Sequence, residues 1–209
     1  MSGTLLIATH NAHKTAEMRA ILGPCFDRIT DLTELPGMVP PEENGRTFAE
    51  NSAIKALAAS VARPDAFILA DDSGLEVDAL GGAPGIHSSR YSGEDATDAS
   101  NRDKLLRELA RPEHADAPRT ARFRCVVTLA KGGEVLARFD GTVEGRIAPV
   151  MTGAGGFGYD PLFVPEGHEK SFGELTEEQK NAISHRSRAL EQFREWLRHE
   201  RPEGKPPHR

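Results

Sequence analysis

The chain has 209 residues, of which 38% are hydrophobic and 28% charged, a composition typical of a globular domain with a sizeable core. Its formal net charge of −6 disfavours a protein that coats nucleic acid, but allows a small polyanion to be held by a few local cations. Two cysteines are too few for a disulfide framework, which fits a reducing cytosol. The apolar run at residues 5–8 is too short for a signal peptide or a membrane span.

The first predicted elements are a strand over residues 4–9 and a helix over residues 11–22, with Asn11 as its N-cap. The strand leads into a helix N-terminus, where free backbone N–H groups and the positive dipole end favour a phosphate. Thr9 and Asn11 add polar side chains, and Lys14 adds a full charge. We therefore predict a phosphate cradle. The simpler alternative is a plain cap with a surface pair between Lys14 and the glutamate three residues on.

A capping box at residues 47–50 opens a second predicted helix, which runs toward Val61. Glu42 and Glu43 precede the box, and Lys55 lies on one flank of the helix. Either glutamate could complete a metal site with an acid elsewhere, although acids near a helix N-terminus are favourable without a ligand. The stripe expected to face the core, spaced i, i+3, i+4 and i+7, is Ile54, Leu57, Ala58 and Val61.

The apolar run at residues 67–70 predicts a short buried strand that delivers Asp71 and Asp72 into a Ser-Gly turn. Adjacent carboxylates at a strand end, beside a glycine that permits close approach, suit a hard cation such as Mg²⁺. Asp-Ser-Gly is also ordinary turn chemistry, so this stretch alone supports a metal site and a surface turn equally.

The second half of the chain predicts a helix, a long hairpin and two further helices. Overall we expect an α/β fold, with a mixed twisted β-sheet, flanking helices and a long antiparallel hairpin arm, in two lobes around a central groove. The predicted segments are a helix at 98–109, a linker at 112–118, hairpin strands at 123–129 and 135–139 around a turn at 131–133, a short strand at 162–164, a capping box at 176–179 and a last helix from Ser184 to about His199.

The glycine-rich run at residues 153–158 matches G-x-G-x-x-G, but Pro161 follows too closely for a dinucleotide-binding helix to start there. We expect a loop in which Phe157 and Tyr159 stack on a base and Asp160 accepts a hydrogen bond from a ring N–H. Aromatic side chains that fill the core are the competing interpretation.

In the run from Lys180 to Arg186, Ser184 is expected to break one helix and cap the next. His185 and Arg186 then become donors for a carbonyl or phosphate oxygen, although each is individually more often a satisfied or surface side chain. The chain has neither a zinc-binding His/Cys spacing nor a GxSxG motif. The remaining combination favours Mg²⁺-assisted hydrolysis of a nucleotide.

Read in order, these blocks resemble the inosine/xanthosine triphosphate pyrophosphatase family: THNAHKTAE, FAENSAIK, ADDSGLEVDALGGAPGIHSSRYSG, GGFGYDP and KNAISHR. The resemblance implies hydrolysis of deaminated purine nucleoside triphosphates (ITP, dITP, XTP) to the monophosphate and pyrophosphate, which cleanses the nucleotide pool. It also implies Mg²⁺ as cofactor, a single pyrophosphatase domain over residues 1–200, and a cytoplasmic homodimer with no nucleic-acid or membrane partner. Residues 201–209, which are rich in proline and charge, are expected to form a disordered tail.

By position, the resemblance assigns Asp72 as the catalytic proton acceptor and Glu42 or Glu43 as the metal-binding acid, with Glu42 favoured alongside Asp72. Arg186 or Lys180 would face O6 of the base and Asp160 its N1–H, so a 6-amino base would be mismatched. The substrate-binding residues implied are Thr9, His10, Asn11, Ala12, His13, Lys14, Lys55, Ser73, Phe157, Gly158, Tyr159, Asp160, Lys180, His185 and Arg186.

Three alternatives stay open at this point. A Maf-like nucleotide pyrophosphatase would open with a Ser/Arg-rich loop, where this chain has THNAHKTAE. A regulator that binds a triphosphate without cleaving it would not need both acidic pairs. A single-strand nucleic-acid binder would need more than 6% aromatic residues and a basic stripe.

Overall fold

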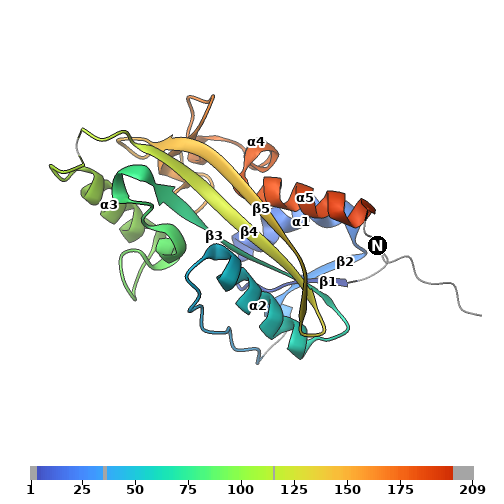
Figure 1. Cartoon of the computed structure of the whole chain (residues 1–209). Coiled ribbons are helices and arrows are strands. Elements are labelled where there is room, and N and C mark those ends of the chain that lie inside the picture. Colours follow the sequence, from blue (N-terminus) through green and yellow to red (C-terminus); the bar gives the residue numbers. More distant parts are fainter. Residues whose placement is uncertain (1–3, 35–36, 115, 200–209) are drawn as a thin grey trace, which may run out of the picture.

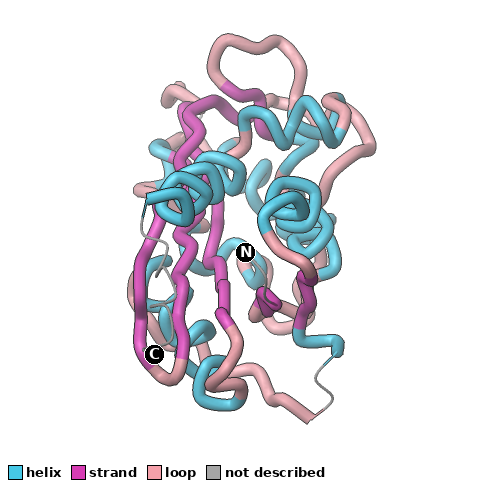
Figure 2. Tube along the Cα trace, turned by 90° about the vertical axis from the view of Figure 1, so that its right-hand side faces the viewer, coloured by secondary structure: helices cyan, strands magenta, loops and turns pink. Residues whose placement is uncertain are grey.

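The computed structural model describes residues 4–34, 37–114 and 116–199, so the tail expected over residues 201–209 lies outside the described residues. One six-stranded sheet runs through the molecule in the order β2-β1-β3-β4-β5-β6 (Figures 1 and 2). Its strands are β1 (Thr4–Ile7), β2 (Arg28–Asp31), β3 (Phe67–Val77), β4 (Thr120–Lys131), β5 (Glu134–Ile147) and β6 (Phe163–Pro165).

Helices cover both faces of this sheet. α5 and α1 lie on one side of the long strands, and α2 packs against β3 and β4 from the other (Figure 1). The α-helices are α1 (Ala12–Leu22), α2 (Phe48–Ala62), α3 (Asp98–Leu109), α4 (Glu177–Ile183) and α5 (His185–His199). The predicted α/β fold with a mixed sheet, flanking helices and a hairpin arm is confirmed. No helix among the described residues is long and apolar enough to cross a membrane.

The strand order suggests where a ligand can bind, at the carboxyl end of β1. β1 lies between β2 and β3 and pairs with both in parallel, so the chain connections from β1 lead to opposite sides of it. Beyond β3, every neighbouring pair is antiparallel. In open α/β sheets, ligands bind beyond the carboxyl end of a strand whose neighbours are reached in opposite directions. The end of β1 is such a point.

β3 is longer than the sequence predicted. It continues to Val77, with Asp71 opposite Val127 and Asp72 opposite Val126 of β4. The predicted Ser-Gly turn is therefore wrong, because the antiparallel ladder with β4 runs on through it. The pairing of β3 with β1 stops at Leu69. Both carboxylates thus stand on a continuous strand, just beyond the end of its parallel neighbour.

The buried face of α2 also differs from the prediction. Val61, the last residue of the expected stripe, is 70% exposed. Small residues lie against the sheet instead and allow close approach, and Ser52 shares a 2.7 Å hydrogen bond with Thr128 of β4. The buried side chains of α2 are Phe48, Asn51, Ser52, Ala53, Ala56, Ala59 and Ser60.

Local signals located the hairpin and the last helices correctly. β4 and β5 join through Gly132 and Gly133, whose φ angles of 59° and 84° suit a two-residue turn. Ser184 is extended, at φ −67° and ψ 159°, and separates α4 from α5. α5 begins directly over Gly141 of β5, where an added Cβ would lie 2.6 Å from the backbone N of Ala189. This close approach sets the start of α5 over the sheet.

Candidate active site

A cavity opens beyond the end of β1, between the N-terminus of α1, the middle of β3 and the start of α5. It brings together most of the predicted site residues, from five separate segments of the chain. Those that line it are Asn11, Lys14, Lys55, Asp72, Ser73, Phe157, Gly158, Tyr159, Asp160, Lys180, His185 and Arg186, together with Glu43.

The first turn of α1 forms one wall. Asn11 caps the helix as predicted, and its Oδ1 accepts hydrogen bonds from the backbone N of His13 at 3.0 Å and of Lys14 at 3.2 Å. Thr9 Oγ1 accepts from the backbone N of Asn11 at 3.1 Å. The Lys14 ammonium reaches into the molecule and lies 3.0 Å from Asp71 Oδ2, so the simple surface pair does not describe it.

A lysine joins two acids on the opposite wall. Lys55 Nζ donates to Glu43 Oε2 at 3.0 Å and to Asp72 Oδ1 at 3.1 Å. Asp72 Oδ2 is buried and has no hydrogen-bond partner among the described residues. Glu42 is exposed and does not line the cavity. The structure therefore places Glu43, and not the favoured Glu42, beside Asp72.

Burial and charge act in opposite directions on these groups. Burial raises the pKa of Asp72, and the nearby Lys55 and Lys14 only partly offset it. Burial also disfavours the charged form of Lys55, but the carboxylates of Asp72, Asp71 and Glu43 outweigh it and raise the pKa of the ammonium. Lys55 therefore stays charged and holds one oxygen of Asp72.

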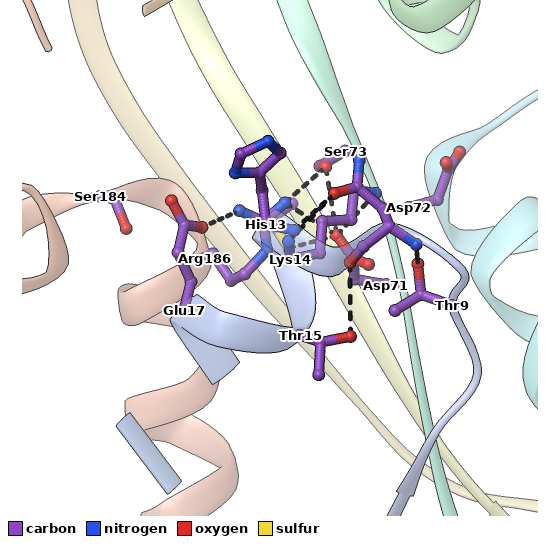
Figure 3. A network of polar contacts seen from close by, with 12 residues as sticks. Thr9, His13, Lys14, Thr15, Glu17, Asp71, Asp72, Ser73, Ser184 and Arg186 are labelled. Carbon is purple, nitrogen blue, oxygen red and sulfur yellow. Dashed lines mark hydrogen bonds and ion pairs between the residues drawn. The ribbon is translucent and has the colours of Figure 1, made fainter. Parts of the chain in front are cut away.

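A buried ion network forms part of the cavity wall. Figure 3 shows its polar contacts. The Arg186 side chain is 1% exposed, and its guanidinium donates to Glu17 of α1. It also donates to Asp71 Oδ2 and to Ser73 Oγ, each at 3.0 Å. Burial would raise the pKa of Asp71, but Lys14 and Arg186 hold it well below its usual range. Glu17 was part of the sequence motif, but its position in this network was not predicted.

Lys180 extends the network to the glycine loop. Its ammonium donates to Glu17 Oε1 at 2.7 Å and to Asp160 Oδ2 at 2.6 Å. Asp160 also accepts from the backbone N of Phe157 at 2.8 Å. Burial raises the pKa of Asp160 despite these donors. Both predicted base-edge cations, Lys180 and Arg186, are thus already paired with carboxylates.

The two aromatic residues of the loop have different surroundings. The Phe157 ring is half-buried and stacks on His13, with 5.3 Å between ring centroids and 14° between planes. The Lys180 ammonium lies 4.6 Å from the Phe157 centroid. Tyr159 is 4% exposed and belongs to a core cluster, and its hydroxyl donates to the carbonyl of Ser88 at 2.9 Å. Its ring fills the core, as the competing interpretation of the loop had it.

His185 completes the floor of the cavity. It is buried and stacks on Phe123, with ring centroids 4.8 Å apart. Burial holds the pKa of His185 well below its usual range, so the imidazole is neutral. Its Nδ1 has no hydrogen-bond partner among the described residues. A neutral ring nitrogen beside the cavity can accept or donate one hydrogen bond.

Four predicted substrate-binding residues do not line the cavity: Thr9, His10, Ala12 and His13. His10 and Ala12 are exposed, and the side chains of Thr9 and His13 support the α1 turn and the Phe157 ring. A further wall was not predicted as part of the site. It comes from the 3₁₀ segment η4 (Gly85–Arg90), which lies inside the family motif at residues 70–93 but was assigned no role, and from α3. Its polar residues are Ser88, Ser89, Arg90, Asp98 and Asn101.

The sequence is similar to one family of proteins over almost its whole length. A model of the Ham1 family matches residues 5–196. A dITP/XTP pyrophosphatase of Halalkalibacterium halodurans is 47% identical over 197 residues, covering 92% of this chain and 97% of that protein. One of Bacillus subtilis is 43% identical over 192 residues, covering 92% and 96%.

Solved structures of Ham1 proteins are similar to this chain in both fold and sequence. A HAM1 protein from Coxiella burnetii has a TM-score of 0.84 at 40% identity and covers 94% of this chain and 98% of its own. The Staphylococcus aureus Ham1 protein has a TM-score of 0.83 at 38% identity, with 95% and 100% covered.

Proposed function

The chain belongs to the Ham1 family, and we propose that it hydrolyses the deaminated purine nucleoside triphosphates ITP, dITP and XTP to the monophosphate and pyrophosphate. Such a reaction removes these nucleotides before they enter DNA or RNA. One observation carries the proposal: a single cavity joins a carboxylate with an unpartnered oxygen, on Asp72, to the buried polar groups around Asp160 and Lys180.

Asp72 is the residue we assign to the chemistry. Its Oδ1 is held by Lys55, which leaves Oδ2 to accept a proton from a water molecule attacking the α-phosphorus. Burial raises the pKa of this carboxyl group, which makes it a better proton acceptor near neutral pH. Lys14 and Lys55 flank the same end of the cavity and would contact phosphate oxygens.

We propose Mg²⁺ as the cofactor, held by Asp72 and Glu43. Lys55 donates to both carboxylates, and both residues line the cavity, so both would face a cation bound beside the phosphates. No cluster of three or more His, Cys, Asp or Glu side chains among the described residues could hold a metal alone. Mg²⁺ keeps several waters and takes substrate phosphates as ligands, so two carboxylates of the chain suffice for the proposed site. When bound, it would neutralise charge on the phosphates.

Base selection is assigned to the other end of the cavity. Phe157 offers a ring face, Asp160 an acceptor for N1–H, and Lys180 or Arg186 a donor for O6. A 6-amino purine would place a donor against these cations and would lack the N1–H, leaving buried polar groups unpaired. Sites built this way discriminate strongly against the mismatched base.

The test is turnover of ITP, dITP and XTP against ATP and GTP at equal concentrations with Mg²⁺. Pyrophosphate and monophosphate are measured separately from orthophosphate, in the wild type, Asp72→Asn and the exposed control Asp103→Asn. We expect pyrophosphate from ITP, dITP and XTP and not from the 6-amino substrate ATP, and we expect this activity to be lost only in Asp72→Asn. Orthophosphate would mean attack at the γ-phosphorus, and tight binding without turnover would make the chain a nucleotide-binding regulator.

We propose further that the protein acts as a homodimer in the cytoplasm, with no nucleic-acid or membrane partner. The family resemblance supports the dimer, and the presence of only two cysteines in the sequence fits a reducing compartment. Light scattering coupled to size-exclusion chromatography tests the dimer. A mass near the 22.7 kDa of one chain at micromolar concentration would contradict it.

A further inference from the structure

Two side chains of α3 hold one residue of the glycine loop. Asp98, the first residue of α3, accepts a hydrogen bond at its Oδ2 from the backbone N of Gly158, at 2.7 Å. Arg102, one helical turn later, donates from Nη1 to the backbone carbonyl of Gly158, also at 2.7 Å. Both backbone polar groups of Gly158 are therefore satisfied by charged side chains more than 50 residues away in sequence.

The held residue lies at the centre of the base end of the cavity. Gly158 directly follows Phe157 and precedes Tyr159 and Asp160. It has φ +59°, and Gly153 and Gly156 of the same loop also have positive φ, so the loop itself has much conformational freedom. Order in this segment must therefore come from contacts outside it. The two bonds from α3 supply that order next to Phe157 and Asp160.

α3 is itself fixed to the cavity wall. Asn101 is 3% exposed, and both ends of its amide are used. Its Oδ1 accepts from the backbone N of Ser92 at 2.7 Å, and its Nδ2 donates to the carbonyl of Ser89 at 3.1 Å. Residues at i, i+3 and i+4 lie on one face of a helix. One face of α3 thus joins the η4 wall through Asn101 and the glycine loop through Asp98 and Arg102.

We propose that Asp98 and Arg102 are positioning residues for base recognition, an inference that rests on the proposed function. By holding Gly158, they set the Phe157 ring and the Asp160 carboxylate, which are tied to each other through the 2.8 Å bond from the Phe157 N. A 6-oxo purine depends on the placement of Asp160 for its N1–H, whereas a 6-amino purine has no such proton. Loosening the loop therefore weakens selection as well as binding.

The experiment measures kcat and KM for dITP and ATP in Asp98→Ala, Asp98→Asn and Arg102→Met. The matched controls on the same helix are Asp103→Ala and Arg107→Met, because both side chains are exposed and make no hydrogen bond or ion pair among the described residues. We expect KM for dITP to rise by about tenfold or more in Asp98→Ala and Arg102→Met, with kcat changed less than about threefold. In the same two variants, the ratio of kcat/KM for dITP to kcat/KM for ATP should fall.

The conservative variant Asp98→Asn distinguishes a positioning role from a general loss of stability. Asparagine can still accept from the Gly158 N, so Asp98→Asn should keep most of the selectivity, and the controls should match the wild type. Unchanged KM and selectivity in Arg102→Met and Asp98→Ala would overturn the proposal, as would equal losses on dITP and ATP. If Asp98→Ala does not fold, Arg102→Met carries the test alone.

Failure of the proposed function gives a different result. If the wild type releases no pyrophosphate from dITP, the same variants are compared by calorimetry for binding of dITP and dATP. A wild-type preference for dITP that is lost in Arg102→Met would support the positioning role without catalysis. Equal affinities of wild type and Arg102→Met for both nucleotides would overturn it.

Discussion

The two neighbouring aspartates of β3 have different roles because side chains alternate between the faces of a strand. Asp71 faces α1 and α5, where Lys14 and Arg186 neutralise it (Figure 3). Asp72 faces α2, where Lys55 holds one oxygen and leaves the other free. The first is a structural counter-ion, and the second is available for chemistry.

Substituting each in turn should separate stability from catalysis. Asp72→Asn should lower kcat by at least about 100-fold, the usual contribution of a general base, while the urea midpoint changes little. Asp71→Asn should destabilise the fold by about 3 kcal/mol, because Arg186 stays buried with a weakened partner. Urea unfolding and dITP turnover of both variants check this. Equal loss of stability in the two would contradict the division of roles.

The two adjacent glutamates offer a matched pair for the metal. Glu43 lines the cavity beside Lys55, whereas Glu42 is exposed outside it. Glu43→Gln should raise the Mg²⁺ concentration for half-maximal turnover by about tenfold or more, and Glu42→Gln should leave it unchanged. A Mg²⁺ titration of dITP turnover measures both. A raised Mg²⁺ requirement in Glu42→Gln and an unchanged one in Glu43→Gln would instead support Glu42, the ligand that the sequence resemblance favoured.

At the scale of elements, the contact between α5 and β5 sets the position of His185 and Arg186. A Cβ on Gly141 would clash with the carbonyl of His185 and lie 2.6 Å from the N of Ala189. Gly141→Ala should therefore push α5 off the sheet and cost about 2 kcal/mol or more. Gly23→Ala is the control, because Gly23 has φ −46° and no atom within 4 Å of an added Cβ. Thermal unfolding compares them, and equal melting temperatures would refute the steric argument.

Elements with local signals were predictable from sequence, and those set by distant partners were not. Gly132-Gly133 and the Thr176 capping box mark a turn and a helix start within a few residues. The continuation of β3 through Asp72 depends on its ladder with β4, more than 50 residues away. The buried face of α2 is set by its close packing on the sheet. Small alanine and serine side chains allow this approach, so they are buried in place of the predicted apolar stripe.

The candidate site was predictable in part for the same reason. Its contiguous motifs, at the start of α1 and in the glycine loop, carry polar residues in patterns that a ligand requires. The part of the wall from α3 has no such pattern, since Asp98 and Arg102 have the spacing of ordinary charges on an exposed helix. Only the fold brings them to Gly158.

For the whole molecule, one buried ion network joins elements from both ends of the chain. Glu17 of α1 accepts from Lys180 of α4 and Arg186 of α5, and Arg186 continues to Asp71 of β3. These elements enclose the cavity, so the same ion pairs that hold the two ends of the chain together also shape the site. Burial favours the neutral form of Glu17, but Arg186 and Lys180 outweigh it and lower the pKa of Glu17 below its usual value.

This lowered pKa predicts how stability depends on pH. An acid whose pKa is depressed on folding adds stability that is fully present above its unfolded pKa and is lost as the pH falls toward the folded pKa. Glu17→Gln should therefore be less stable than the wild type by about 3 kcal/mol at pH 7, with the gap narrowing below about pH 4.5. Asp160, whose pKa is raised by burial and also by the Glu17 charge, changes stability with the opposite sign, and this change is smaller in Glu17→Gln because that charge is absent. Urea unfolding of both at pH 7, 5 and 3.5 measures the gap, and a difference that stayed constant across this range would show that Glu17 does not hold the network as a charged group.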